Sequence, residues 1–289
     1  MRFSILAIAS AVATTAVLAA PTLFSKRDVD SDVAILNYAL SLEYLEDAFY
    51  TWGLNKYDKD DFKKAGYDSV VRERFVHIGE HEAEHVRVLK SVITSLKGTP
   101  LPKCIYKFPL YDVHDFIAVA RALENTGVSA YLGVAAGLEG DLLTAAASIT
   151  TVEARHSSFL NEVLGRTGAP YAYDTPLTVR EIITIAANFV ESCPFEVPIS
   201  PFKQLHAKLP IKRGEKVEVS YKDEDTTKQT WCQFLYSDKI RVSRRSECTL
   251  PQGVNGYVYV VVTDTATPIS LKDDSHILAG PALLFLGDH

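Results

Sequence analysis

Basic residues are scarcer than acidic ones in this chain, 30 against 36, so its 289 residues carry a net charge of −6. No cluster of lysine and arginine reverses this balance locally, which argues against nucleic acid as a partner. After residue 20 no run is apolar and long enough to span a bilayer. The four cysteines form no Cys-x-x-Cys pair, so thiol redox chemistry and a zinc–thiolate site are both disfavoured.

The first residues have the pattern of a secretory signal. Arg2 precedes a run from Phe3 to Leu18 that is apolar apart from small residues. We expect 1–20 to be a signal peptide and 21–28 to be a propeptide-like segment, because Lys26-Arg27 resembles a dibasic processing site. A membrane anchor is the alternative, but the run is short for one. We therefore predict a secreted protein, extracellular or in the cell wall, with no transmembrane anchor.

An oxidising export route would let the four cysteines form two disulfides. Four cysteines allow three pairings, and the sequence alone does not choose among them. We prefer Cys104 with Cys193 and Cys232 with Cys248, since each pair then stays within one of two regions of different periodicity.

The first of these regions, 29–193, shows apolar residues at three- and four-residue spacing, which predicts helices. The expected helices span 31–52, 69–97, 112–138 and 141–164, and a fifth opens at the capping box Thr178-Val-Arg-Glu181. Ser31 and Asp32 are candidate caps of the first helix, and Gly53 is expected to end it.

The connections between these helices indicate a topology. Two or three residues join the third helix to the fourth, which forces the two to be antiparallel. The segment 98–111 contains three prolines and reaches roughly 45 Å when extended, enough to follow a whole bundle. Two antiparallel hairpins joined by one long crossover are typical of ferritin-like four-helix bundles.

The second region, 213–289, alternates apolar and polar residues in short runs separated by turn residues. We expect a small antiparallel β-sandwich-like domain there, with 194–212 as a linker. The predicted fold class is thus mainly α, a bundle with an extra helix followed by a small β domain. The β region contains no group of residues that suggests chemistry.

Two Glu-x-x-His motifs stand on the second and fourth predicted helices, Glu82-Ala-Glu-His85 and Glu153-Ala-Arg-His156. One helix earlier, each is preceded by an acidic residue in an apolar stripe, Glu43 or Glu124. These features repeat between the two halves of the region. The repeat selects Glu43 rather than its neighbour Glu46, whose counterpart is Gly127.

Positions i and i+3 share a helix face, so each motif directs a carboxylate and an imidazole inward together. Four carboxylates in a bundle core are too costly unless cations neutralise them, and two divalent ions would do so. We expect Glu82 and Glu153 to bridge the two ions. The remaining ligands would be Glu43 with His85 and Glu124 with His156, or the crossed pairing. Oxygen and imidazole donors suit iron or manganese better than structural zinc.

Several stretches also resemble a known family. They are 33–50, His85-Val86, 127–132 and 151–156. They are similar to the secreted ferritin-like proteins of fungi, the Rds1-type stress-response group related to plant desiccation-related proteins. The resemblance covers about residues 29–200 and fills all six ligand positions. It implies a di-metal bundle without a settled reaction; manganese catalases, rubrerythrins and ferroxidases are the better-understood relatives.

Three expectations compete with or surround this site. His81-Glu82-Ala-Glu-His85 also fits the His-Glu-x-x-His pattern of zinc metalloproteases, in which both histidines bind zinc. It lacks the Gly-x-x-His continuation and leaves the second Glu-x-x-His unexplained. Tyr50 and Tyr131, each seven residues after a ligand glutamate, are expected to be core aromatics rather than partners of the carboxylates. His77 and His81 are expected on a solvated edge.

The function predicted from these residues is redox chemistry on peroxide or dioxygen, or Fe(II) oxidation, at a di-iron or di-manganese carboxylate site in stress response. Its partners would be metal ions and a small oxidant. The alternative is a non-catalytic secreted or cell-wall stress protein that uses the bundle as a scaffold. Whether the protein is an enzyme of the catalase, peroxidase or ferroxidase kind, and whether it is an oligomer, stays open.

Overall fold

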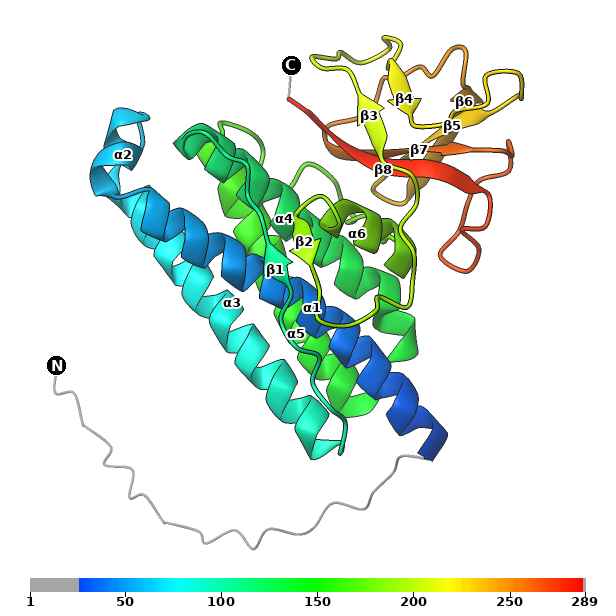
Figure 1. Cartoon of the computed structure of the whole chain (residues 1–289). Coiled ribbons are helices and arrows are strands. Elements are labelled where there is room, and N and C mark those ends of the chain that lie inside the picture. The colour runs from blue at the N-terminus through cyan, green and yellow to red at the C-terminus, as the bar shows by residue number, and fades with distance from the viewer. Residues whose placement is uncertain (1–25, 288–289) are drawn as a thin grey trace, which may run out of the picture.

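The computed structural model describes residues 26–287 (Figure 1). The predicted signal peptide and most of the propeptide-like segment lie outside these residues. The helices are α1 (Lys26–Lys56), α2 (Lys59–Lys64), α3 (Ser69–Ser95), α4 (Val113–Val134), the short 3₁₀ turn η1 (Ala135–Gly137), α5 (Gly140–Val163) and α6 (Val179–Ala186). The strands are β1 (Ile105–Tyr106), β2 (Val190–Ser192), β3 (Leu205–Ala207), β4 (Val219–Tyr221), β5 (Trp231–Tyr236), β6 (Lys239–Arg244), β7 (Gly256–Thr263) and β8 (Ile277–Leu286).

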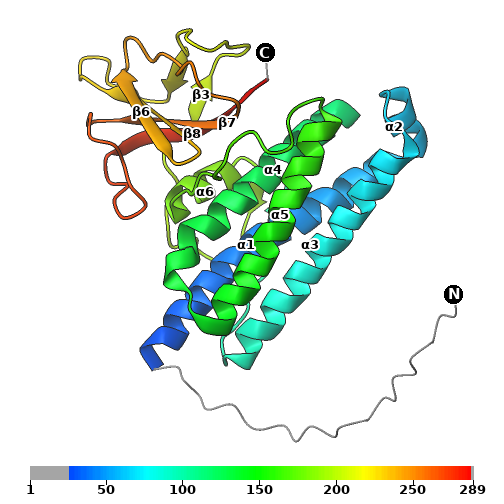
Figure 2. The same cartoon turned by 180° about the vertical axis from the view of Figure 1, so that it is seen from behind.

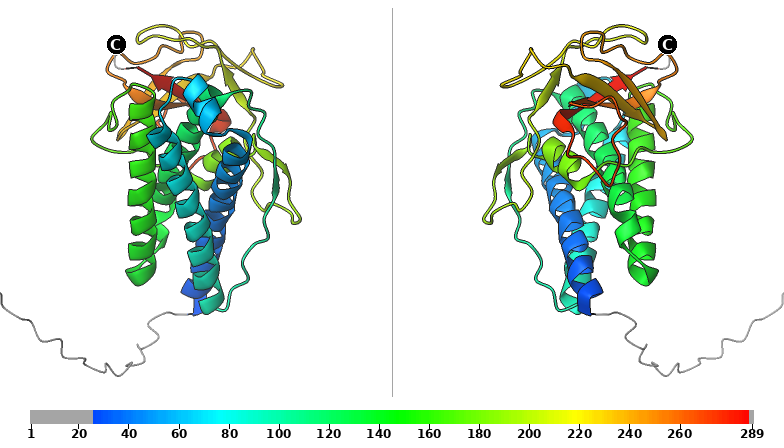
Figure 3. Two further views of the ribbon diagram at one scale, coloured as in Figure 1. Left: turned by 90° about the vertical axis from the view of Figure 1, so that its left-hand side faces the viewer. Right: turned by 90° about the vertical axis from the view of Figure 1, so that its right-hand side faces the viewer.

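The predicted fold class is confirmed. Helices α1 and α3 pack as one antiparallel hairpin and α4 and α5 as another, and the two hairpins form a four-helix bundle (Figures 1 and 2). The crossover between α3 and α4 includes β1 and runs along the outside of the bundle (Figure 3). No helix within 26–287 is both long and apolar enough to cross a membrane.

Local sequence signals set most of the α-helix starts. Asp112 caps α4 by accepting a hydrogen bond from the Asp115 amide at 2.9 Å. Thr178 and Glu181 form the predicted capping box of α6, in which the Thr178 amide donates to Glu181 Oε2 at 2.8 Å. These bonds satisfy amides that a helix start leaves unpaired.

The predicted boundaries of the first helix were wrong at both ends. Helix α1 begins at Lys26, so Ser31 and Asp32 lie inside it rather than capping it. It also continues through Gly53 to Lys56. A Cβ on Gly53 would lie only 2.0 Å from the Phe116 ring, so this glycine serves a close approach of α4 rather than a helix end.

The C-terminal region contains a four-stranded antiparallel sheet in the order β6-β5-β7-β8 and a two-stranded pair, β3 and β4. Strand β3 lies within 194–212, which was expected to be only a linker. Every residue of β7 is buried, because its two faces pack on different cores. Tyr259 and Val261 belong to the core shared with α4 and α6, whereas Val258 and Val260 belong to the core inside the β region.

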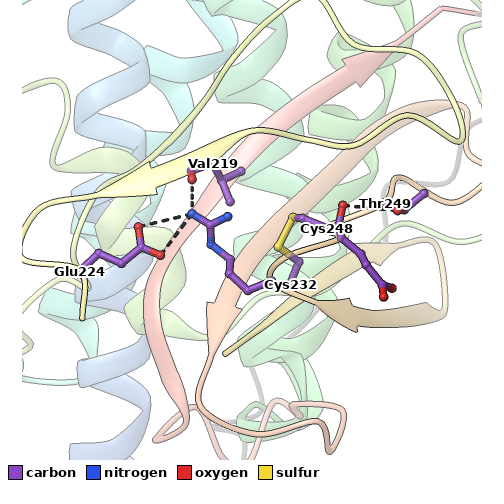
Figure 4. Close-up of a disulfide and its surroundings, with 7 residues drawn as sticks. Val219, Glu224, Cys232, Cys248 and Thr249 are labelled. Carbon is purple, nitrogen blue, oxygen red and sulfur yellow. Dashed lines mark hydrogen bonds and ion pairs between the residues drawn. A yellow bond between two sulfur atoms is a disulfide. The ribbon is translucent and has the colours of Figure 1, made fainter. Parts of the chain in front are cut away.

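Both disulfides join segments of the same region. Cys104 in the crossover is bonded to Cys193 after β2, and Cys232 on β5 is bonded to Cys248. This is the pairing preferred from the sequence. In Figure 4 the second bridge lies near Glu224, which pairs with Arg245 at 3.2 Å.

The core of the bundle consists of two apolar clusters with a gap between them. One is aromatic and includes Phe49, Phe75 and Phe116. The other is mostly aliphatic and includes Leu40 and Ile93. The order of these residues along the helices leaves a layer between the two clusters, and the buried glutamates of α1, α3, α4 and α5 occupy that layer.

Candidate metal centre

All four bundle helices contribute to this layer. Glu43 comes from α1, Glu82 and His85 from α3, Glu124 from α4, and Glu153 and His156 from α5. The four glutamates are 0% exposed, and the two histidines are 9% and 5% exposed, respectively. The structure therefore brings all six residues selected from the sequence into one buried site.

The ligand atoms form two groups that share two glutamates. Atoms of Glu43, Glu82, His85 and Glu153 lie within 4.8 Å of one another, and so do atoms of Glu82, Glu124, Glu153 and His156. Glu82 and Glu153 belong to both groups, as residues that bridge two ions would. Each group adds one further carboxylate and one imidazole, which we call the Glu43/His85 half-site and the Glu124/His156 half-site.

The two imidazoles present the same ring nitrogen to the carboxylates. His85 Nδ1 lies 3.1 Å from Glu43 Oε2, 3.1 Å from Glu82 Oε2 and 3.3 Å from Glu153 Oε1. His156 Nδ1 lies 3.0 Å from Glu124 Oε2 and 3.2 Å from Glu82 Oε1. Nδ1 is therefore the nitrogen available to a cation in both half-sites.

Three carboxylate oxygens in the site are buried without a hydrogen-bond donor. They are Oε1 of Glu82 and both oxygens of Glu153. The imidazole contacts at 3.2 Å to Glu82 Oε1 and 3.3 Å to Glu153 Oε1 are ion-pair contacts that lack the geometry of hydrogen bonds. A buried polar atom left unpaired costs about 1–3 kcal/mol, and more when it is charged. The orphaned oxygens belong to the two glutamates shared by both groups, so the donor set fits a pair of cations lying between them.

Tyrosine hydroxyls hold the two outer carboxylates from the opposite helix. Tyr50 on α1 donates to Glu124 Oε1 on α4, and Tyr131 on α4 donates to Glu43 Oε1 on α1 at 2.5 Å. The expectation that these tyrosines are only core aromatics was wrong, because their rings are buried and their hydroxyls also bind ligand residues. Their spacing of seven residues from Glu43 and Glu124 was the signal.

Interactions within the cluster shift the pKa values of its members in opposite directions. Burial raises the pKa of Glu43 to about 7 and, together with nearby carboxylates, raises that of Glu153 well above its ordinary value. Burial would also raise the pKa of Glu82, but contacts with His156 and His85 lower it to about 2. Burial would lower the pKa of His85 and His156, yet the carboxylates raise both, that of His156 to about 10. Protons are thus held tightly at positions that a cation would fill.

A fifth acidic residue, Glu46, lies beside the cluster and was passed over in the sequence. It is 3% exposed and belongs to neither group of ligand atoms. Burial and the charge of Glu153 raise its pKa well above the ordinary value. A Cβ on Gly127 would lie 3.1 Å from Glu46 Oε1 and 2.8 Å from Glu153 Oε2, so this glycine provides the space for both. The repeat concealed Glu46 because its counterpart is glycine.

Glu46→Gln is expected to stabilise the metal-free protein at pH 8 by about 1–3 kcal/mol, because it removes a buried carboxyl group whose ionised form is disfavoured by burial and by the neighbouring carboxylates. Metal stoichiometry should not change, since Glu46 lies outside both groups of ligand atoms. Urea denaturation of protein whose metal has been removed with a chelator (the chelated protein) measures the change in the free energy of unfolding. The control is Glu73→Gln, at an exposed position on α3. Loss of bound metal in the Glu46 variant would contradict this assignment.

The zinc-protease pattern is not supported by the geometry. Glu82 lies inside both groups of ligand atoms, whereas His81 belongs to neither. His81 Nδ1 instead lies 3.0 Å from Nε2 of His156, on the side away from the carboxylates. His81 is exposed, as expected, but it is also in contact with a residue of the site.

The β region contacts the bundle directly behind the site. The Tyr259 hydroxyl of β7 lies 2.7 Å from Asn125 Nδ2 and 2.9 Å from Ser129 Oγ on α4. The Tyr257 hydroxyl lies 3.1 Å from Ser157 Oγ on α5. Asn125 and Ser157 directly follow ligand residues in the sequence. The sheet therefore supports the helix segments that carry the Glu124/His156 half-site.

Tyr259→Phe is expected to lower the free energy of unfolding by about 1–3 kcal/mol, because it leaves the buried Asn125 and Ser129 side chains without this partner. Chemical denaturation followed by circular dichroism measures the change. Tyr111, which is 88% exposed, provides a matched control as Tyr111→Phe. Equal stability of the two variants would mean that the contact between the sheet and the bundle contributes nothing to the free energy of unfolding.

Comparisons with known proteins agree with this fold. Residues 31–166 match the family described as ferritin-like domain. Protein rds1 of Schizosaccharomyces pombe is 29% identical over 170 residues, which are 58% of this chain and 41% of that protein. This chain thus matches less than half the length of that relative.

Two solved structures are also similar. One, described as ferritin like, diiron-carboxylate proteins from Bacillus anthracis, has 20% identity and a TM-score of 0.43, covering 48% of this chain and 99% of its own. The other, a conserved hypothetical protein from Mycobacterium tuberculosis, has 19% identity and a TM-score of 0.42, covering 50% and 99%. The predicted resemblance is confirmed by the family match and the yeast relative: residues 31–166 form a ferritin-like domain, and the chain is similar to Rds1-type ferritin-like proteins.

Proposed function

We propose that the six buried residues hold two iron or two manganese ions. The observation that carries this proposal is the set of orphaned oxygens on Glu82 and Glu153, which lie between two half-sites of equal composition. Four carboxylates carry the charge that two divalent cations balance, and the donor set contains no thiolate. Glu82 and Glu153 would bridge the ions, and each half-site would complete one of them.

The side chains divide the work at this site. His85 and His156 offer Nδ1, while Glu43 and Glu124 each offer the oxygen that is not held by a tyrosine. The tyrosine hydroxyls fix the orientation of these carboxylates, and the two apolar clusters keep water away from both ends of the site. A bound iron or manganese pair would supply two-electron redox chemistry on peroxide or dioxygen, or oxidation of Fe(II).

We further propose that the protein is exported, with removal of 1–20 and processing after Lys26-Arg27, and that it acts in a stress response outside the cell or in the cell wall. The support is the signal-like sequence together with two disulfides, which persist in oxidising compartments. The similarity to protein rds1 of Schizosaccharomyces pombe supports a fungal origin of this chain.

The reaction is tested by loading the full chain with Fe(II) or Mn(II). Fe(II) oxidation and hydrogen peroxide consumption are then compared with Glu82→Ala and, as control, the exposed Glu84→Gln on the same helix. We expect turnover in the wild type and the control and its loss in Glu82→Ala. Metal binding without turnover in the wild type would contradict the enzymatic proposal and favour a scaffold with a structural metal.

A further inference from the structure

Nε2 of His156, the ring nitrogen that faces away from the carboxylates, has a hydrogen-bond partner in the protein, His81. His81 lies one turn before His85 on α3, and its ring is nearly parallel to that of His156, with 5.2 Å between the centroids and 10° between the planes. The hydrogen bond joins His81 Nδ1 to His156 Nε2 at 3.0 Å. His81 is the residue of the His-Glu-x-x-His motif that the metal-pair assignment leaves unused.

The direction of this hydrogen bond follows from the position of His156. Its Nδ1 faces Glu124 and Glu82, so a cation in the site would bind Nδ1 and leave the proton on Nε2. Nε2–H then donates to Nδ1 of His81. Such a partner fixes the tautomer and the ring orientation of a metal-binding histidine and makes it a stronger donor.

The other half-site lacks this feature. The repeat that relates Glu82 to Glu153 and His85 to His156 places Val152 at the position equivalent to His81. Valine cannot accept a hydrogen bond. Among residues 31–287 the structure shows no hydrogen bond to Nε2 of His85. The two half-sites thus have equal ligands but unequal surroundings.

We propose that His81 is a positioning residue that makes the two metal positions unequal in affinity. Through His156 it strengthens binding at the Glu124/His156 half-site, which fills before the Glu43/His85 half-site. This inference rests on the proposed metal pair. Loss of an outer partner of a metal ligand typically weakens binding 10- to 100-fold, so the difference is large enough to measure.

The test is a titration of the metal-free full chain with Co²⁺, followed by the absorption of bound cobalt and by calorimetry. The wild type is expected to bind two ions in two steps that differ at least about tenfold in affinity. His81→Val, which copies Val152, should weaken the tighter step about 10- to 100-fold and merge the two steps. His81→Gln retains an acceptor and should restore most of the difference.

His77→Val is the matched control, because His77 lies one turn earlier on the same exposed edge and contacts Glu80 rather than the site. The unfolding temperature of each metal-free variant shows whether the fold is intact. Identical titrations of the His81 and His77 variants, or equal weakening of both steps in His81→Val, would overturn this inference while leaving the metal pair standing. A wild type that binds no Co²⁺ would overturn both.

Discussion

Replacing Glu153 by glutamine is expected to abolish binding of both metal ions and, at the same time, to stabilise the metal-free protein. Glu153 is 0% exposed, belongs to both groups of ligand atoms and has two carboxylate oxygens without a donor. Glutamine keeps the volume but removes a carboxyl group whose ionised form is disfavoured by burial and by the neighbouring carboxylates, so the metal-free form should gain about 1–3 kcal/mol at neutral pH. An ordinary core residue would give the opposite sign.

Two measurements on the same samples check this prediction. Elemental analysis after loading with iron or manganese gives the metal content, and urea denaturation after chelation gives the stability. Glu162→Gln, at an exposed position on α5, is the control and should leave both unchanged. A Glu153 variant that retains two ions, or that loses stability in the chelated form, would show that Glu153 does not bridge a metal pair.

The pH dependence of stability is expected to reverse when metal is removed. In the chelated protein, Glu43 has its pKa raised to about 7, and Glu153, His85 and His156 are also raised. Groups with raised pKa values stabilise the fold below their unfolded pKa and lose that contribution as pH rises through the folded one. Glu43 alone accounts for a loss on the order of 3 kcal/mol. Glu82, with a pKa near 2, contributes with the opposite sign, but only at pH values below about 4.

The chelated protein should therefore melt at progressively lower temperature between pH 5 and 8. The melting temperature of the metal-loaded protein should instead rise with pH over the same range, because cations compete better for these ligands as the protons dissociate. Thermal denaturation across this range, with and without a chelator, measures both slopes. Slopes of the same sign in the two forms would mean that metal does not replace the protons of these residues.

Much of the bundle was predictable because its signals are local. Capping residues such as Asp112 and Thr178 mark helix starts through bonds within four residues. The six clustered residues were also predictable. The repeat shows which helix faces they share, and carboxylates on a buried helix face are costly unless cations neutralise them. Gly53 was wrongly predicted to end α1. In the sequence alone, a glycine that ends a helix cannot be distinguished from one inside a helix that makes room for an opposing residue such as Phe116.

The residues that the sequence did not reveal act across helices. Glu46 has no counterpart in the repeat, and its burial depends on how α1 faces α4 and α5. The hydroxyls of Tyr50 and Tyr131 find partners 74 and 88 residues away, a pairing that no local pattern encodes. The contact of Tyr259 with α4 likewise depends on how the sheet packs against the bundle. The sequence of the β region alone does not predict this packing.

The metal content of the protein purified from its natural source is the measurement that matters most for this interpretation, because loading in a foreign host inserts whichever ion is abundant. We expect close to two ions of iron or manganese per chain. Protein that is free of metal, or that carries a single zinc ion per chain, would contradict the metal pair.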